Sequence, residues 1–231
     1  MYAGSTMRWC VQSDEENLLF GTDRGCAEFE QRVLRFDRAG AGAGEAVPAD
    51  DEVLYVLAGR GSATIAGQPT NLVPGTAVYV AAGSSWSVDN AEELELLSVL
   101  VRDPLPANGV RYAVVGVEEV EAGEATAGRM FRILVPCPSA TQFVGYIPPG
   151  RAPDHYHRYD EVVYVLQGNG ALHIGSESTE LRAGSCIHLP AKLVHSLENH
   201  GPDEMQVLGV FRPAGSPAEA YYPDGTPALQ Y

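Results

Sequence analysis

Two segments of this 231-residue chain repeat one another, and this repeat limits the possible folds more than any other feature. Residues 51–61 (DEVLYVLAGRG) align without a gap with residues 160–170 (DEVVYVLQGNG), at an offset of 109 residues. The same offset continues downstream through five pairs: Leu72 and Leu181, Gly75 and Gly184, Val80 and Leu189, Trp86 and His195, and Asn90 and Asn199. A repeat of this length indicates that one structural unit occurs twice.

Each copy has the pattern of an all-β unit. Short runs rich in Val, Leu, Ile and Tyr are interrupted by turns, and the chain contains 25 glycines and 16 prolines. Helical periodicity is nearly absent, and two short helices are expected, one after Ser13 and one after Ser216. Residues 102–109 read RDPLPANG, which predicts a linker. We therefore expect two domains, residues 1–105 and residues 106–231.

The charge and cysteine content narrow the function classes. The chain carries 15 basic and 30 acidic residues, a net charge of −15, so we expect no nucleic-acid partner and no membrane partner. No run of apolar residues reaches the length of a membrane-spanning helix, and no secretory signal pattern is present. The four cysteines show no C-x-x-C spacing, which favours a reducing, cytoplasmic setting.

All six histidines lie between residues 155 and 200, and this clustering favours a metal site. In an extended segment His155 and His157 project to the same side, where two imidazoles can bind one ion. Glu161 has the same parity and can add a carboxylate, while a fourth ligand must come from elsewhere. The remaining histidines are expected to be hydrogen-bonded or exposed: His173, His188 and His200.

This segment resembles the two conserved motifs of the cupin superfamily. The first motif has a glycine, a histidine-x-histidine pair, a glutamate and a second glycine. The residues in those places are Gly150, His155, His157, Glu161 and Gly168. The second motif is matched by Gly184, Pro190, His195 and Asn199, with Lys192 where the family usually has glycine.

The resemblance implies two tandem cupin barrels, each a double-stranded β-helix or jelly roll. It also implies that His195 completes a metal site with His155, His157 and Glu161, holding one divalent transition metal: Fe, Mn, Ni, Zn or Cu. The 109-residue offset places three different residues at the histidine positions of the first copy: Ala46, Pro48 and Trp86. We therefore expect the first barrel to be structural or to hold a dry pocket.

Cupins with this ligand set differ in their reactions. We expect an oxidoreductase of dioxygenase type that acts on a small enolisable or aromatic substrate, in an apolar cup lined by Val163 and Val165. Glu161 is a candidate proton acceptor, and Tyr146 is a second catalytic candidate. The alternatives are a metal-dependent isomerase, decarboxylase or lyase, and a non-enzymatic small-molecule-binding cupin. The tail after Arg212 is expected to pack on a barrel or across a homodimer.

Overall fold

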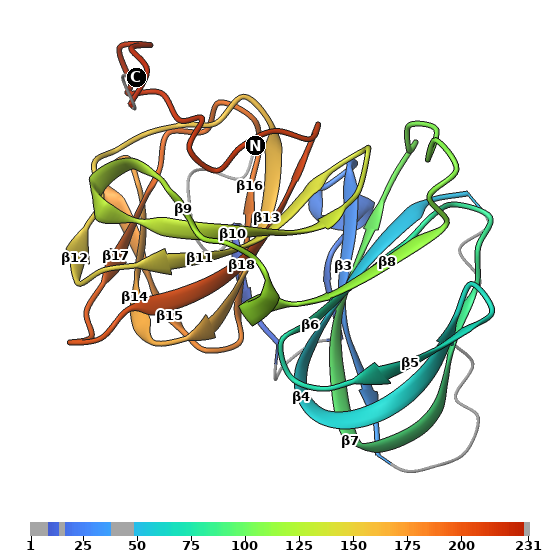
Figure 1. The fold of residues 1–231 in the computed structure, drawn as a ribbon. Helices are drawn as coiled ribbons and strands as arrows, with labels where there is room; N and C mark the ends of the chain where they lie inside the picture. The colour runs from blue at the N-terminus through green and yellow to red at the C-terminus, as the bar shows by residue number, and fades with distance from the viewer. Residues whose placement is uncertain (1–8, 14–16, 38–48, 229–231) are drawn as a thin grey trace. The chain divides into compact units, whose positions relative to one another are not determined.

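The computed structural model describes residues 9–13, 17–37 and 49–228, and nearly all regular secondary structure in this part of the chain is β-strand (Figure 1). It forms two compact units. One unit, the first barrel, contains residues 17–120 and 134–141, and the other, the second barrel, contains residues 121–133, 142–228 and the described residues before 17. The predicted all-β fold with two structural units is confirmed.

The first barrel is built on one sheet with the strand order β2-β3-β7-β4-β6-β8, and β5 pairs with β4. Its strands are β2 (Leu18–Phe20), β3 (Phe29–Phe36), β4 (Asp51–Ile65), β5 (Gln68–Leu72), β6 (Thr76–Val80), β7 (Trp86–Val101) and β8 (Tyr112–Gly116). The long strands β4 and β7 pair along most of their length, with register shifts between Val56 and Ala58, Ala58 and Arg60, and Ser62 and Ala63.

The second barrel contains a sheet with the order β1-β16-β13-β18-β11-β10-β9 and a sheet with the order β12-β17-β14-β15. The first of these sheets consists of β1 (Cys10–Gln12), β9 (Gly123–Glu124), β10 (Met130–Pro136), β11 (Thr141–Ile147), β13 (Asp160–Gln167), β16 (Ser185–Leu189) and β18 (Met205–Arg212). The second consists of β12 (Gly150–Arg151), β14 (Asn169–Ile174), β15 (Glu177–Arg182) and β17 (Ser196–Asn199).

The sequence repeat extends to the pairing register of the strands. Glu52 lies opposite Val80 in the β4–β6 pair, and Glu161 lies opposite Leu189 in the β13–β16 pair. The following positions of both pairs keep the same 109-residue offset. Since a one-residue slip would turn every side chain to the other face, the two glutamates occupy equivalent inward positions.

Each barrel buries alternate residues of its strands in its own core. The first core includes Leu54, Val56, Val78 and Val80, together with Trp86 and Leu96. The second includes Val163, Val165, Leu172, Ile187 and Val207. Full burial of one such aliphatic side chain stabilises a fold by about 1.5–3 kcal/mol. The two cores therefore supply the driving force for closing the sheets.

Two strand pairs join strands from opposite sides of the predicted boundary between residues 105 and 106. β1 pairs with β16 in the second barrel, and β8 pairs with β6 in the first barrel. The segment between β7 and β8 contains no strand, as its prolines predict. The division into residues 1–105 and 106–231 remains a proposal. A boundary at that point would separate β1 from β16 and β8 from β6.

Helical structure is scarcer than the sequence predicts. The described residues contain three 3₁₀ turns of three residues each, Thr22–Arg24, Val117–Glu119 and Thr126–Gly128, and none of these is long enough to span a bilayer. The prediction of a helix after Ser216 is wrong. A single turn forms there because the backbone of Tyr221 pairs with Tyr156 and draws the chain into an extended course. Residues 14–16, where the other helix was expected, lie outside the described residues.

The turn before His195 keeps the geometry of a glycine although it contains Lys192. Lys192 has φ +67°, and Gly83, at the equivalent position of the first barrel, has φ +77°. The left-handed region costs a residue with a side chain about 1–2 kcal/mol. The Lys192 amide donates to the His157 carbonyl at 2.7 Å, and this hydrogen bond holds the turn against His157.

Replacing Lys192 with glycine should therefore stabilise the second barrel. We expect Lys192→Gly to raise its melting temperature by about 2–4 °C, because the strained φ is relieved and the exposed side chain takes no buried contact with it. Gly83→Ala is the matched control, since a Cβ at Gly83 meets no atom within 4 Å and adds only the strain. A lower melting temperature for Lys192→Gly in differential scanning calorimetry would contradict this account.

Candidate metal centre

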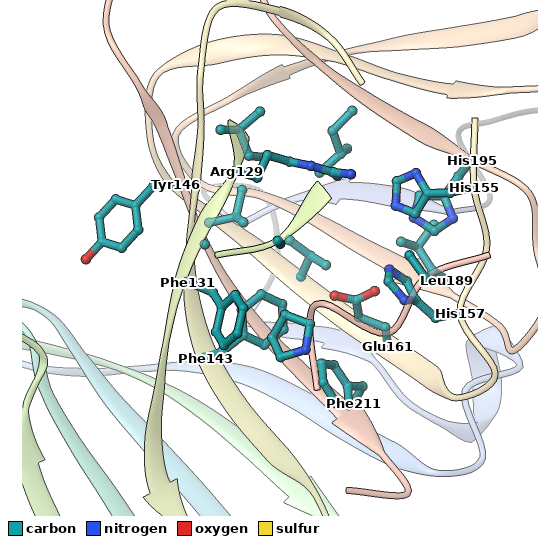
Figure 2. Close-up of a pocket in the computed structure, with 18 of the residues that line it drawn as sticks. Arg129, Phe131, Phe143, Tyr146, His155, His157, Glu161, Leu189, His195 and Phe211 are labelled. Atoms are coloured by element: carbon teal, nitrogen blue, oxygen red, sulfur yellow. The ribbon is translucent and has the colours of Figure 1, made fainter. Parts of the chain in front are cut away.

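The structure brings three of the predicted ligands together at one end of the second barrel (Figure 2). His155 and His195 are backbone partners: each amide donates to the other's carbonyl, at 3.0 and 2.9 Å. Their ring centroids lie 4.7 Å apart, and that of His157 lies 5.2 Å from His155 and 5.8 Å from His195. One nitrogen from each ring lies within 4.8 Å of the others, which is close enough to share an ion.

Backbone carbonyls fix the orientation of all three imidazole rings. The Nδ1 atoms of His155, His157 and His195 each lie 2.9 Å from a carbonyl oxygen. The acceptors are Pro153, Glu219 and Leu193, respectively. A carbonyl oxygen only accepts, so each Nδ1 carries the proton and each Nε2 keeps a free lone pair. This is the tautomer that a metal ligand needs when it binds through Nε2.

Burial keeps these imidazoles neutral. It lowers the pKa of His155 to about 2, of His195 to about 3 and of His157 to about 4. Nearby positive charge lowers these pKa values further, and the backbone hydrogen bonds oppose the shift. The three rings are therefore in the ligand form throughout the physiological pH range.

Glu161 lies in the same cavity with an unsatisfied carboxylate. It is buried, and it makes no hydrogen bond or ion pair with the described residues. Burial raises the pKa of Glu161 to about 8, although the charge of Arg129 lowers it. Its oxygens lie outside the group of atoms within 4.8 Å that the three histidines form. Glu161 is therefore placed beside the imidazoles, and its role as a ligand stays a prediction.

Aromatic side chains form one wall of the cavity. Phe143 and Phe211 pack with ring centroids 5.4 Å apart, and Phe131 packs against them. Gly209 makes this possible, because a Cβ there would lie 2.3 Å from Phe143 ring atoms and 3.2 Å from the nearer oxygen of Glu161. Val163 lines the cavity as predicted, whereas Val165 lies in the core below it.

Arg129 is a cavity residue that the sequence does not reveal. It immediately precedes β10 and donates from Nε to the Thr126 carbonyl at 3.0 Å and from Nη2 to the Thr126 hydroxyl at 2.7 Å. Its guanidinium extends toward His155 and His195 (Figure 2). No motif contains this arginine, so only the folded chain shows that it reaches the site.

The tail after Arg212 packs on the second barrel, which is one of the two predicted arrangements. The hydroxyl of Tyr159 donates to the carbonyls of Ser216 and Glu219, at 2.6 and 3.0 Å. Glu219 is also the residue whose carbonyl orients His157. Pro217 and Ala220 line the cavity, so the tail forms part of its wall.

Tyr146 lies on β11 with its ring directed away from the histidines (Figure 2). It has the opposite parity from Phe143 and Ile147, whose side chains pack in the interior. The Arg132 guanidinium lies 5.9 Å from its ring centroid. Tyr146 is one of the residues that line the cavity, but its hydroxyl points away from the histidines, and its catalytic role stays a prediction.

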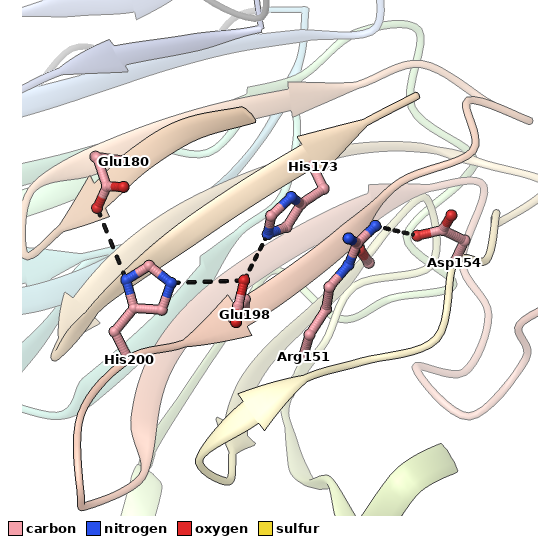
Figure 3. Close-up of polar contacts among 7 residues, drawn as sticks. Arg151, Asp154, His173, Glu180, Glu198 and His200 are labelled. Carbon is pink, nitrogen blue, oxygen red and sulfur yellow. Dashed lines mark hydrogen bonds and ion pairs between the residues drawn. The ribbon is translucent and has the colours of Figure 1, made fainter. Parts of the chain in front are cut away.

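The other three histidines lie outside the cavity. His173 and His200 both face Glu198 on the β14–β17 side of the barrel, at 2.8 and 3.5 Å, and His200 also lies 3.8 Å from Glu180 (Figure 3). His188 is buried and lies 3.3 Å from Asp160. Each therefore has a hydrogen-bonding or ion-pair role, as the sequence analysis expects.

The first barrel keeps the glutamate and closes the space around it. The Glu52 carboxylate accepts hydrogen bonds from the Trp86 indole at 2.6 Å and from the Ser98 hydroxyl. In the repeat, Trp86 occupies the position of His195. Ser98 lies opposite Leu54 in the first barrel, as Gly209 lies opposite Val163 in the second, so Ser98 and Gly209 occupy equivalent positions. The indole packs in the core, so this position holds a satisfied carboxylate. Ala46 and Pro48 lie outside the described residues.

The shifted histidines predict how the metal-free protein responds to acid. Below about pH 6.5 the unfolded chain takes up protons on these imidazoles, whereas the folded chain does not until about pH 4 for His157. On these imidazoles the unfolded state then binds up to three more protons, while on Glu161, with its pKa raised to about 8, the folded state binds one more. Stability therefore falls as the pH drops, by at most about 3 kcal/mol per pH unit for a net two protons.

Replacing all three ligands with glutamine should flatten this dependence. We expect the free energy of unfolding of the His155→Gln, His157→Gln, His195→Gln variant to change less between pH 6.5 and pH 4.5 than that of the metal-free wild type. Urea titrations of the whole protein at several pH values, followed through the unfolding of the second barrel, measure this free energy. Equal slopes for the two proteins would show that these imidazoles titrate normally.

Comparison with known proteins agrees with the fold. The profile of the cupin domain family (Cupin_2) matches residues 143–211. Polyketide synthase CurC of Streptomyces cyaneus is 28% identical over 127 residues, which are 52% of this chain and 82% of that protein. Quercetin 2,3-dioxygenase of Bacillus subtilis is 34% identical over 91 residues, 35% of this chain and 27% of that protein.

Solved structures share the two-barrel fold at low sequence identity. The protein Ylba of E. coli superposes with a TM-score of 0.74 and 16% identity, covering 88% of this chain and 89% of that chain. An oxalate decarboxylase of Bacillus subtilis superposes with a TM-score of 0.69 and 14% identity, covering 90% and 78%. The repeat, the barrel topology and these superpositions agree on a fold of two tandem cupin barrels, and residues 143–211 of the second barrel match the Cupin_2 domain family.

Proposed function

We propose that the second barrel binds one divalent transition metal through His155, His157, His195 and Glu161. The observation that carries this proposal is the set of three buried imidazoles, each with its Nδ1 proton held by a backbone carbonyl and one ring nitrogen within reach of the others. A buried carboxylate without a described hydrogen-bond partner lies beside them. Burial removes water as a partner for this carboxylate, and a bound cation would compensate its charge.

The donor set fits the metals that the sequence analysis names. Neutral imidazoles and a carboxylate suit Fe, Mn, Ni, Zn and Cu, and the ligand types alone do not select among these five elements. When bound, such an ion supplies a Lewis acid and a template for substrate oxygen atoms.

We further propose that the protein is an oxidoreductase of dioxygenase type acting on a small enolisable or aromatic molecule. The phenylalanine wall would bind a flat apolar group and exclude water from the cavity. Sequence similarity to a quercetin dioxygenase supports the reaction type. Similarity to a polyketide synthase fits an enolisable substrate, because polyketides carry ketones on alternating carbons.

A second candidate, a metal-dependent decarboxylase, lyase or isomerase, rests on Glu161. Burial raises the pKa of Glu161 to about 8, so when this carboxylate is released from the ion it can take up a proton at neutral pH. A carboxyl group that holds a proton beside a substrate can deliver it to a carbon or an oxygen in a reaction that needs no oxygen molecule. The two candidates therefore differ in their need for dioxygen.

Elemental analysis of protein purified without added metal tests the site itself. We expect about one equivalent of a transition metal per chain, and less than about a hundredth of the wild-type affinity in a His155→Ala, His157→Ala double variant. The matched control is His173→Ala, His200→Ala, which removes two histidines from the outer face and should keep the metal. Metal-free wild type, or equal metal content in both variants, would contradict the site.

Oxygen consumption distinguishes the two candidate reactions. Each metal form is mixed with enediols, flavonols and diketones in an oxygen electrode, and the same mixtures are followed by mass spectrometry without oxygen. A dioxygenase should consume dioxygen in proportion to the substrate lost and be inactive anaerobically. Turnover that continues at the same rate without oxygen would exclude the dioxygenase and support the second candidate.

A further inference from the structure

The cavity of the second barrel contains a positive charge that the proposed metal site does not use. Apart from the three histidines, the acidic and basic side chains among its described lining residues are Glu161 and Arg129. Figure 2 shows the Arg129 guanidinium extended across the cavity toward the imidazoles. Arg129 is therefore positioned to contact a molecule that occupies the space next to the metal ligands.

Neutral groups anchor Arg129 without cancelling its charge. Its Nε and Nη2 atoms donate to the carbonyl and hydroxyl oxygens of Thr126, and it forms no ion pair with a described carboxylate. The Nη1 amino group donates no hydrogen bond to the described residues, so it remains available to a ligand. Hydrogen bonds to Thr126 hold the guanidinium in one orientation, which lowers the entropy that binding would cost.

Metal binding would increase the excess of positive charge. A divalent ion adds two positive charges, and Glu161 is the single carboxylate among the described lining residues to oppose them. Arg129 would then share the cavity with a cation and have no counter-charge of its own. Charges of the same sign in a water-poor site are costly, so an anionic occupant is favoured electrostatically.

The rest of the cavity lining indicates which uncharged group a bound molecule would carry. Phe131, Phe143 and Phe211 form an aromatic wall, and the remaining described lining is largely aliphatic. Such a lining offers few partners for several hydroxyl groups, which argues against a sugar. It matches a flat apolar group instead.

We propose that the site takes a small anionic molecule, a carboxylate or an enolate attached to a flat apolar group, with Arg129 bound to its anionic oxygen. This inference rests on the proposed function for the location of the metal, and it specifies the substrate class of that site. The apolar group lies against the phenylalanine wall, and the anionic end lies between Arg129 and the ligand histidines.

Calorimetric titration with benzoate and with its neutral analogue benzamide tests this proposal. The protein is used both metal-free and loaded with Zn(II), which carries out no redox chemistry. Wild type should bind benzoate at least about tenfold more tightly than benzamide. Arg129→Met should lose about 10- to 100-fold of the benzoate affinity, the range for one charge-assisted hydrogen bond, and keep its benzamide affinity.

Two further variants separate a binding role from a folding role. Arg129→Lys keeps the charge and should retain part of the benzoate affinity, while Arg182→Met, at an exposed position on β15, should bind like wild type. Zinc content and melting temperature are measured for every variant. A variant that loses benzoate binding with unchanged zinc content and melting temperature supports a direct contact.

Zinc binding and benzoate binding are measured separately, so failure of the metal site can be told from failure of the anion site. If zinc does not bind, the metal site fails, and benzoate binding to metal-free protein still decides the role of Arg129. Benzoate binding that disappears in Arg129→Met supports the anion site with or without zinc. Equal benzoate affinity in wild type and Arg129→Met, benzamide binding as tight as benzoate, or no benzoate binding to wild type would overturn the inference.

Discussion

A carboxylate buried in a barrel core needs hydrogen-bond donors, a cation or a proton, and this chain carries one at the same register position in each barrel. In the first barrel, Trp86 and Ser98 donate to Glu52, and the indole fills the space. In the second barrel, His195 replaces the indole, and Glu161 is left facing an open cavity. Similar backbones thus give a closed core in one barrel and a candidate metal centre in the other.

The second barrel holds its imidazoles with backbone atoms from segments far apart in the sequence. The mutual backbone pairing of His155 and His195 sets their separation, and the carbonyl of Glu219, in the tail, sets the orientation of His157. Tyr159 fixes that carbonyl in turn. The tail is therefore part of the structure that orients the site, and the geometry of the three rings depends on the barrel having closed.

Much of the fold and part of the site follow from the sequence, for physical reasons that individual residues show. The two-residue periodicity of strands is local, so the pairing of His155 with His157 on one face can be predicted from spacing. The repeat identifies Trp86 as the counterpart of His195, but it does not reveal that Glu52 accepts a hydrogen bond from that indole. Arg129 and the Glu219 carbonyl reach the site through tertiary packing, and no local pattern reports such contacts.

The central claim is that one barrel holds an ion and the other does not, because their equivalent carboxylates have different partners. Anomalous X-ray diffraction at the absorption edge of the bound element, from crystals of protein purified without added metal, measures this directly. The account predicts one strong anomalous peak, between the ring nitrogens of the three histidines and Glu161, and no peak beside Glu52. A peak beside Glu52, or none near His155 and His195, would contradict it.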